Sequence, residues 1–271
     1  TNTNKDRQFA YAHMGQYAGV AITTQGELIA WGHSSYGGTL PTNTNKNRQF
    51  AYAHMGQYAG VAITTQGELI AWGDSSYGGT LPTNTNTNRQ FAYANMGQHA
   101  GVAITTQGEL IAWGDSSKGG TLPTNTNTNR QFAYAHMGGD AGVAITTQGE
   151  LIAWGNSDYG GTLPTNTNTN RQFAYAHMGD DAGVAITTQG ELIAWGHSSY
   201  GGTLPTNTNT NRQFAYTHMS EYAGAAITTQ GELIAWGHSD YGGTLPTNTN
   251  KDRQFAYTHM SGFAGVALAM P

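Results

Sequence analysis

Histidine, serine and aspartate occur together in a loop that recurs along the chain, as in His238-Ser-Asp240. These residue types can supply the nucleophile, the base and the orienting acid of acyl-transfer catalysis. Such chemistry needs one constellation beside an oxyanion site, whereas here similar loops return at a fixed spacing. We therefore expect a chain that is not an enzyme and that uses no cofactor.

A second group of histidines recurs once per repeat, at the end of a short alternating segment. These are His13, His54, His136, His177, His218 and His259, and Asn95 stands in the place of the third. Imidazoles in series could bind a metal ion. Replacement of one of them by asparagine favours a hydrogen-bonding role instead. The chain has no cysteine, so thiolate sites are excluded, and we predict no metal site.

The element that positions these residues is a repeat with a period of 41 residues. The stretch from Gly19 to Gly32 returns almost unchanged from Gly60, Gly101, Gly142, Gly183 and Gly224. The repeats are 1–41, 42–82, 83–123, 124–164, 165–205, 206–246 and a partial copy, 247–271. A fixed period of this length predicts a single domain built as a repeat array.

Each repeat is predicted to form four antiparallel strands. In the first copy these are 7–14, 18–23, 27–32 and a short fourth strand, Thr39-Leu40, which Pro41 ends. The second and third strands carry large residues on one side and glycine or alanine on much of the other, so that neighbouring sheets can stack. This pattern favours an all-β fold, a β-propeller, over a parallel β-helix, whose coils are usually shorter.

The pattern of two strands around a glycine turn, then Trp31-Gly32 and a polar loop closing on Gly37-Gly38, resembles the regulator-of-chromosome-condensation family. Within that family it is most similar to the secreted bacterial propellers that inhibit β-lactamases. The resemblance implies a seven-bladed ring and a secreted or extracellular bacterial protein. The partial last repeat predicts an incomplete blade, 26 strands in all, and self-association through the open edge of residues 253–269.

Differences between the repeats collect in two loops, the turn after the first strand and the loop after the third. Antiparallel strands place both loops at the same end of each sheet, where tyrosine offers contact area at a low entropic cost. We predict that this end binds a partner. The predicted partner-binding residues are Tyr17, His33, Tyr36, Tyr58, Asp74, Tyr77, His99, Asp115, Lys118, Asp140, Asn156, Tyr159, Asp181, His197, Tyr200, Tyr222, His238, Tyr241 and Phe263.

The opposite end carries an arginine in every repeat and a glutamate in every full one, such as Arg48 and Glu68. We expect bidentate pairs that join one blade to the next. Trp31 and its counterparts are expected to pack between blades.

Charge and hydropathy narrow the choice of partner. The net charge is −5 with only 10% charged residues, which argues against nucleic acid, and no apolar run reaches the roughly 20 residues of a membrane span. Acidic residues on the variable loops favour a basic or hydroxyl-rich partner. Three functions stay open: an inhibitor-like protein-binding module, a lectin with one shallow site per blade, and a structural subunit that assembles through the last blade.

Overall fold

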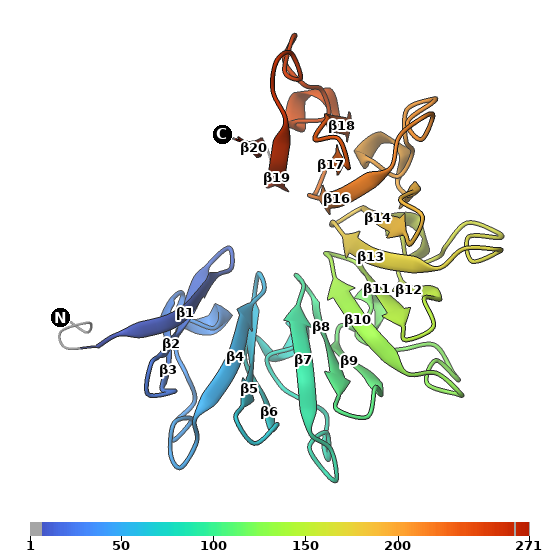
Figure 1. The fold of residues 1–271 in the computed structure, drawn as a ribbon. Coiled ribbons are helices and arrows are strands. Elements are labelled where there is room, and N and C mark those ends of the chain that lie inside the picture. Colours follow the sequence, from blue (N-terminus) through green and yellow to red (C-terminus); the bar gives the residue numbers. More distant parts are fainter. Residues whose placement is uncertain (1–6, 263, 271) are drawn as a thin grey trace. The chain divides into compact units, whose positions relative to one another are not determined.

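The computed structural model describes residues 7–262 and 264–270. The chain divides into two compact units, Thr1–Gln131 and Phe132–Pro271. Both units repeat one element, an antiparallel sheet of three strands followed by a single 3-10 turn (Figure 1). Within the described ranges no helix has the length and hydropathy of a membrane span.

The first unit holds three such sheets, each with its strands in chain order. Their elements are β1 (Phe9–Met14), β2 (Ala18–Thr23), β3 (Leu28–Gly32), η1 (Ser34–Tyr36), β4 (Phe50–Met55), β5 (Ala59–Thr64), β6 (Leu69–Gly73), η2 (Ser75–Tyr77), β7 (Phe91–Met96), β8 (Ala100–Thr105), β9 (Leu110–Gly114) and η3 (Ser116–Lys118).

The second unit holds three sheets of the same kind and a shorter last one. Their elements are β10 (Phe132–Met137), β11 (Ala141–Thr146), β12 (Leu151–Gly155), η4 (Ser157–Tyr159), β13 (Phe173–Met178), β14 (Ala182–Thr187), β15 (Leu192–Gly196), η5 (Ser198–Tyr200), β16 (Phe214–Met219), β17 (Ala223–Thr228), β18 (Leu233–Gly237), η6 (Ser239–Tyr241), β19 (Phe255–Met260) and β20 (Gly265–Ala269). The last sheet has two strands, which confirms the incomplete blade.

The predicted fourth strand, Thr39-Leu40, was wrong, and so was the total of 26: the described residues form 20 strands. A side chain takes the place of that strand. Asn45 accepts a hydrogen bond from Leu28 N at 2.8 Å and donates its amide to Leu28 O at 2.8 Å. The same asparagine clamp recurs in the following repeats, as at Asn86 and Leu69. At Leu28 the outer edge of the third strand is thus satisfied by one residue of the connector.

Stacking of neighbouring sheets forms the core. In the first unit, Val20, Ile22 and Leu28 of one sheet are buried against Phe50, Met55 and Trp72 of the next. Trp72 Nε1 also donates to Gly37 O of the preceding loop at 2.8 Å, so the stack fixes that loop. The predicted packing role of the tryptophans is confirmed here, whereas Trp31, on the first sheet, is 42% exposed.

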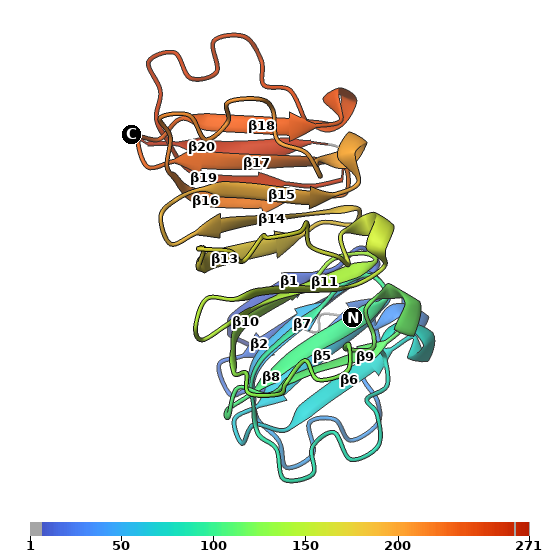
Figure 2. The same cartoon turned by 90° about the vertical axis from the view of Figure 1, so that its right-hand side faces the viewer.

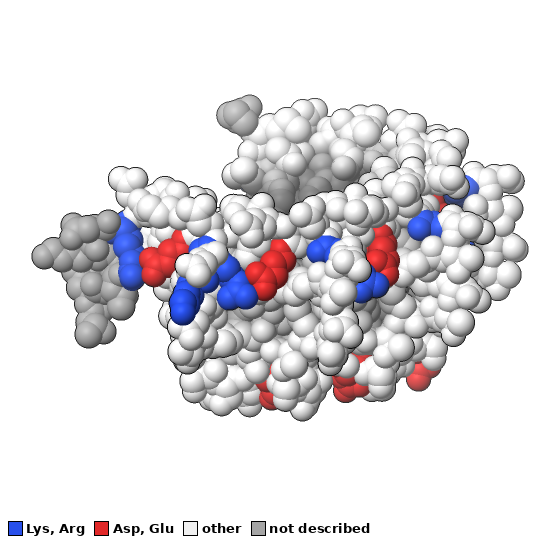
Figure 3. All heavy atoms as spheres, turned by 90° about the horizontal axis from the view of Figure 1, so that it is seen from below, with Lys and Arg blue, Asp and Glu red and all other residues white. Residues whose placement is uncertain are grey.

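The arginine–glutamate pairs lie where the connectors enter the sheets. Arg48 Nε and Nη2 donate to Glu68 Oε2 and Oε1, both at 2.8 Å. The bidentate geometry was predicted, but the joining of one blade to the next was wrong, because the two residues belong to the same repeat. Arg48 enters β4 and Glu68 lies in the β5–β6 turn, so folding of the hairpin brings them together. Figure 3 shows basic and acidic side chains side by side in a row on this face.

Candidate functional site

The variable loops lie at one end of each sheet, as predicted. Because β2 pairs antiparallel with both β1 and β3, the β1–β2 turn and η1 share that end. We call it the loop end, and we call the end with the long connectors the connector end. Figure 2 shows the 3-10 turns and the connectors at opposite ends of the sheets within each unit. Of the predicted site residues, Phe263 is outside the described residues.

The residues that begin the 3-10 turns vary, and the structure gives several of them a capping role. Asp74 accepts a hydrogen bond from Ser76 N at 2.9 Å, and Asn156 accepts one from Asp158 N at 3.1 Å. Asp115 accepts from the amide and the hydroxyl of Ser117. These hydrogen bonds, with nearby His99 and Lys118, lower the pKa of Asp115. The variation at this position is therefore partly a choice among capping residues.

In the first unit, predicted residues from different blades meet in a continuous aromatic strip, formed by Tyr17, Tyr36, Tyr58, Tyr77 and His99. Ring centroids lie 5.2 Å apart for Tyr17–Tyr36 and 5.1 Å apart for Tyr36–Tyr58. The strip continues through Tyr58–Tyr77 at 4.9 Å and Tyr77–His99 at 5.0 Å. Its members come alternately from a strand turn and a 3-10 turn, so neighbouring blades build one surface.

Tyr58 lies in the middle of this strip and contacts the most rings. Burial and the neighbouring phenols of Tyr17, Tyr77 and Tyr36 raise its pKa. The hydroxyl therefore stays protonated at neutral pH and can donate a hydrogen bond to a ligand. A rigid apolar strip with polar tips is suited to contact with a protein surface.

In the second unit, carboxylates gather at the same end. We call Asp140, Asp180, Asp181 and Glu221 the acidic cluster. Burial, a hydrogen bond with Glu221 and repulsion from the other carboxylates raise the pKa of Asp180 to about 8. Asp180 is consequently protonated at neutral pH and can donate its hydrogen bond to Glu221.

The Asp180–Glu221 pair was not among the predicted site residues. They are 41 residues apart and occupy the same position in successive repeats. Gln16 and Gln57, at the same position in the first two repeats, also bond to each other. Equivalent positions of this turn are thus neighbours across blades, and the repeat period alone could have paired them.

A contact between a histidine ring and a tyrosine ring recurs inside single loops. The rings of His33 and Tyr36 stack with centroids 4.4 Å apart. The rings of His197 and Tyr200 lie 4.6 Å apart, and those of His238 and Tyr241 lie 4.7 Å apart. Tyr200 also contacts Tyr222, and Tyr159 contacts His197, so predicted residues of the second unit meet as well.

The strand histidines form ladders that support the loop end. The rings of His136 and His177 lie 4.0 Å apart, and those of His177 and His218 lie 4.1 Å apart. Met178 N donates to His136 Nδ1 at 3.3 Å, so the ring acts as an acceptor and must be neutral. Burial lowers the pKa of His136 to about 4 and that of His218 to about 3. Asn95, the one substitution, lies 3.3 Å from His54 Nε2, in line with the predicted hydrogen-bonding role.

The described residues contain no group of three or more histidines, aspartates and glutamates arranged to hold a metal ion. The histidine ladders are extended series, and their Nδ1 atoms are occupied by backbone amides, as His13 shows with Met55 N.

Comparison with known proteins defines the fold. No family model matches the chain, and neither does any curated protein sequence. Among solved structures, human WBSCR16 has a TM-score of 0.65 at 16% identity, over 97% of this chain and 87% of its own. Prp20p from Saccharomyces cerevisiae, also described as yeast RCC1, has a TM-score of 0.65 at 14% identity, over 99% and 84%. The fold is that of a β-propeller.

A third propeller match is the ectodomain of the Physcomitrella patens receptor kinase CR4, with a TM-score of 0.65 at 13% identity. It is covered over 71% of its length, and this chain over 97%. The predicted all-β propeller class is confirmed, and the seven repeats agree with the strand pattern. Likeness to RCC1 propellers is confirmed at the level of fold.

Proposed function

We propose that the chain is a non-catalytic protein-binding module that recognises its partner through the loop end. The observation that carries the proposal is the aromatic strip, in which five predicted residues from three successive repeats form one surface. Its two outer members, Tyr17 and His99, come from the first and third repeats. Drifting solvent-exposed positions have no reason to pack across blades with ring centroids 5.0–5.1 Å apart.

The structural neighbours support binding of a protein. Prp20p is described by its binding properties toward Gsp1p and histones, and it is also seen bound to Kap60. These partners belong to Prp20p. For this chain we infer only the class of partner, and the acidic cluster favours a basic one.

Inhibition of an enzyme is the form of binding that fits the strip best. A rigid surface of tyrosines loses little conformational entropy on binding, which is a property of tight protein contacts. The resemblance to secreted bacterial inhibitors, noted in the sequence, supports a secreted location and an enzyme as the partner. Aspartates replace the aromatic at Asp140 and Asp181, so we place the anchor in the first unit.

A multivalent lectin is the second candidate, and the repeated histidine–tyrosine stacks favour it. Three loops carry this pair at 4.4–4.7 Å, and stacked rings beside polar loops could hold a sugar. Stoichiometry separates the two functions. A lectin binds several equivalent glycans per chain, whereas a protein-binding module binds one partner through the strip.

The proposal can be tested by photo-crosslinking followed by titration. A photoreactive amino acid at exposed Ser35, beside Tyr36 at the loop end, should trap the partner from its native source. The same group at exposed Gln66, at the connector end, is the matched control.

The trapped protein is then purified and titrated against the wild type and the Tyr58→Ala variant. We expect the substitution to weaken binding by at least about tenfold, as loss of a central aromatic anchor does. A Thr65→Ala variant at the connector end should bind like the wild type. Equal affinity for all three proteins would overturn the proposal.

A further inference from the structure

The last interface between sheets repeats the others with two side chains missing. Between the fifth and sixth sheets, Val184 and Leu192 are buried against Phe214, Met219 and Trp236, with Ile234 partly buried beside them. Between the sixth and seventh sheets, Ala225 and Leu233 meet Phe255 and Met260. No described residue stands where Trp236 and Ile234 would have their counterparts, because the seventh sheet has two strands.

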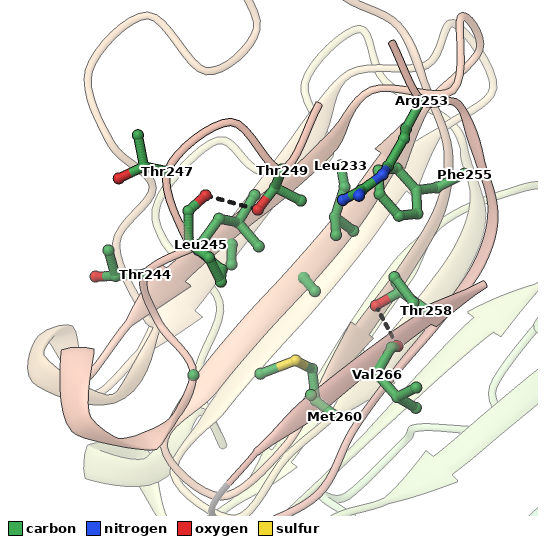
Figure 4. Close-up of a pocket in the computed structure, with 16 residues that line it drawn as sticks. Leu233, Thr244, Leu245, Thr247, Thr249, Arg253, Phe255, Thr258, Met260 and Val266 are labelled. Carbon is green, nitrogen blue, oxygen red and sulfur yellow. Dashed lines mark hydrogen bonds between the residues drawn. The ribbon is translucent and has the colours of Figure 1, made fainter. Parts of the chain in front are cut away.

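A groove of about 350 Å³ occupies that place. Figure 4 shows Leu233 and Phe255 along one side, Leu245 on the other, and Met260 below. The volume lies in the range of about 300–1,000 Å³ that is typical of ligand sites. The groove is thus an apolar seat between two sheets, open along the unpaired edge of β20.

Two glycines of the groove match glycines that serve a tryptophan elsewhere. In the sixth sheet Gly224 lies under the indole: a Cβ atom there would be 2.4 Å from Trp236 Cζ2. Trp236 Nε1 donates to Gly201 O at 2.9 Å. The counterparts, Gly265 and Gly242, both line the groove. The seat therefore offers space for an indole ring and a carbonyl acceptor for its N–H.

A charged residue marks one end of the groove. In the sixth repeat Arg212 donates to both carboxylate oxygens of Glu232, at 2.8 and 2.9 Å. Arg253 is the equivalent arginine and lines the groove. The described residues give Arg253 no ion-pair partner, so its guanidinium can pair with a carboxylate brought by a ligand.

The backbone of β20 completes the pattern. In the sixth sheet Gly224 pairs with Trp236, and Ile227 pairs with Leu233. On β20 the same positions are Gly265 and Leu268, and the described residues pair this strand on one edge only, with β19. A free edge beside a side-chain pocket is the arrangement that binds extended peptides by strand addition.

We propose that this groove binds an extended segment of a partner protein as a third strand, antiparallel to β20, with the pattern Glu-Leu-x-x-Trp. The glutamate pairs with Arg253, the tryptophan ring lies on Gly265 and Met260, and its N–H donates to Gly242 O. This groove runs along the edge of the last sheet, from Arg253 to Gly242, and the proposal does not depend on the function proposed for the aromatic strip.

The test uses a fluorescein-labelled peptide with the sequence of residues 229–237, titrated with the full chain and followed by anisotropy. We expect saturable binding, weakened at least about tenfold when the tryptophan of the peptide is replaced by alanine. A scrambled peptide of the same composition should not bind. Equal binding of the native, alanine and scrambled peptides would overturn the proposal.

Two protein variants locate the peptide. Gly265→Val places a side chain in the indole seat and should abolish binding, while Ser198→Val, exposed at the loop end, should not change it. Because Gly265→Val could disturb the last sheet, Arg253→Gln provides an independent check. It should weaken the native peptide but not a peptide whose glutamate is replaced by glutamine. Unchanged binding by both groove variants would contradict the assignment.

A second copy of the chain is the alternative occupant. In that case the protein alone would dimerise with increasing concentration in sedimentation experiments, and the peptide would dissociate the dimer. That result would overturn a peptide partner in favour of self-association. Failure of the peptide to bind the monomer would also overturn the proposal.

Discussion

The two ends of each sheet are built from the same strands but differ in what varies between the repeats. At the connector end Asn86 clamps Leu69, Arg48 pairs with Glu68, and equivalent contacts recur with nearly the same distances. At the loop end the side chains change from tyrosine to histidine or aspartate while the backbone stays the same. The connector end therefore maintains the fold, and the loop end is free to carry recognition.

Acidic pH should destabilise the loop end more than it destabilises the connector end. The histidines at the loop end are neutral in the folded chain, with pKa values lowered to about 4 for His136 and about 3 for His218. Unfolded histidine binds a proton near pH 6.5, so stability is fully present above that pH and is lost as the pH falls toward 4. For a ring such as His136 the loss between pH 6.5 and 5 is roughly 2 kcal/mol.

Urea unfolding at pH 7 and at pH 5 measures this loss, and the His177→Asn variant is the matched control. It copies the asparagine that the chain already carries at position 95, and it should reduce the loss on acidification. The bidentate hydrogen bonds from Arg48 lower the pKa of Glu68. The connector end should therefore keep its stability down to a lower pH than the loop end. A stability that does not change between pH 7 and pH 5 would contradict the neutral ladders.

A single substitution should lower the free energy of unfolding more at the connector end than at the loop end. In Asn86→Ala the Leu69 N–H and C=O lose the partners that lie at 2.8 and 2.9 Å. An unsatisfied group of this kind costs about 1–3 kcal/mol, so we expect a loss of about 2–3 kcal/mol in the free energy of unfolding. Denaturant titration checks the value. Thr87→Ala, an exposed neighbour, should stay within about 0.5 kcal/mol of the wild type. An equal loss in both variants would mean that the asparagine clamp does not stabilise the fold.

The acidic cluster should respond to pH in the opposite sense from the histidine ladders. The folded pKa of Asp180, about 8, lies above its ordinary value of 3.8, so its ionised form is disfavoured in the folded chain. Stability should fall as the pH rises toward and through about 8. Asp180→Asn should remove that slope and raise the melting temperature at pH 9 relative to the wild type, with little difference near pH 4. An unchanged slope would mean that Asp180 is not protonated in the folded chain at neutral pH.

Much of the fold followed from the sequence because it depends on local pattern. The alternation in Ala18–Thr23 and the period of 41 residues predicted the strands, the stacking and the incomplete last blade. The fourth strand failed because Asn45 satisfies the sheet edge with its side chain, a contact that hydropathy does not reveal. The Asp180–Glu221 pair was missed because two acidic side chains in successive repeats were expected to repel and not to form a hydrogen bond.

The sequence predicted which end of the sheets carries the candidate site, but it did not predict how the residues of the site are arranged. Variation between repeats indicated the loop end, and antiparallel pairing grouped its residues. The sequence could not show that Tyr36 and Tyr77 lie on either side of Tyr58, because that order depends on how far one blade is rotated against the next. It also could not separate residues that cap the 3-10 turns, such as Asp74, from residues available to a partner.

We infer that one end of the sheets recognises the partner while the other maintains the fold. Hydrogen exchange followed by mass spectrometry, with and without the trapped partner, tests it most directly. We predict added protection in the strand turns and 3-10 turns of the first unit, residues 15–17, 33–38 and 56–58. We predict none in the connector of residues 41–47. Protection confined to the connector, or spread equally over both ends, would contradict it.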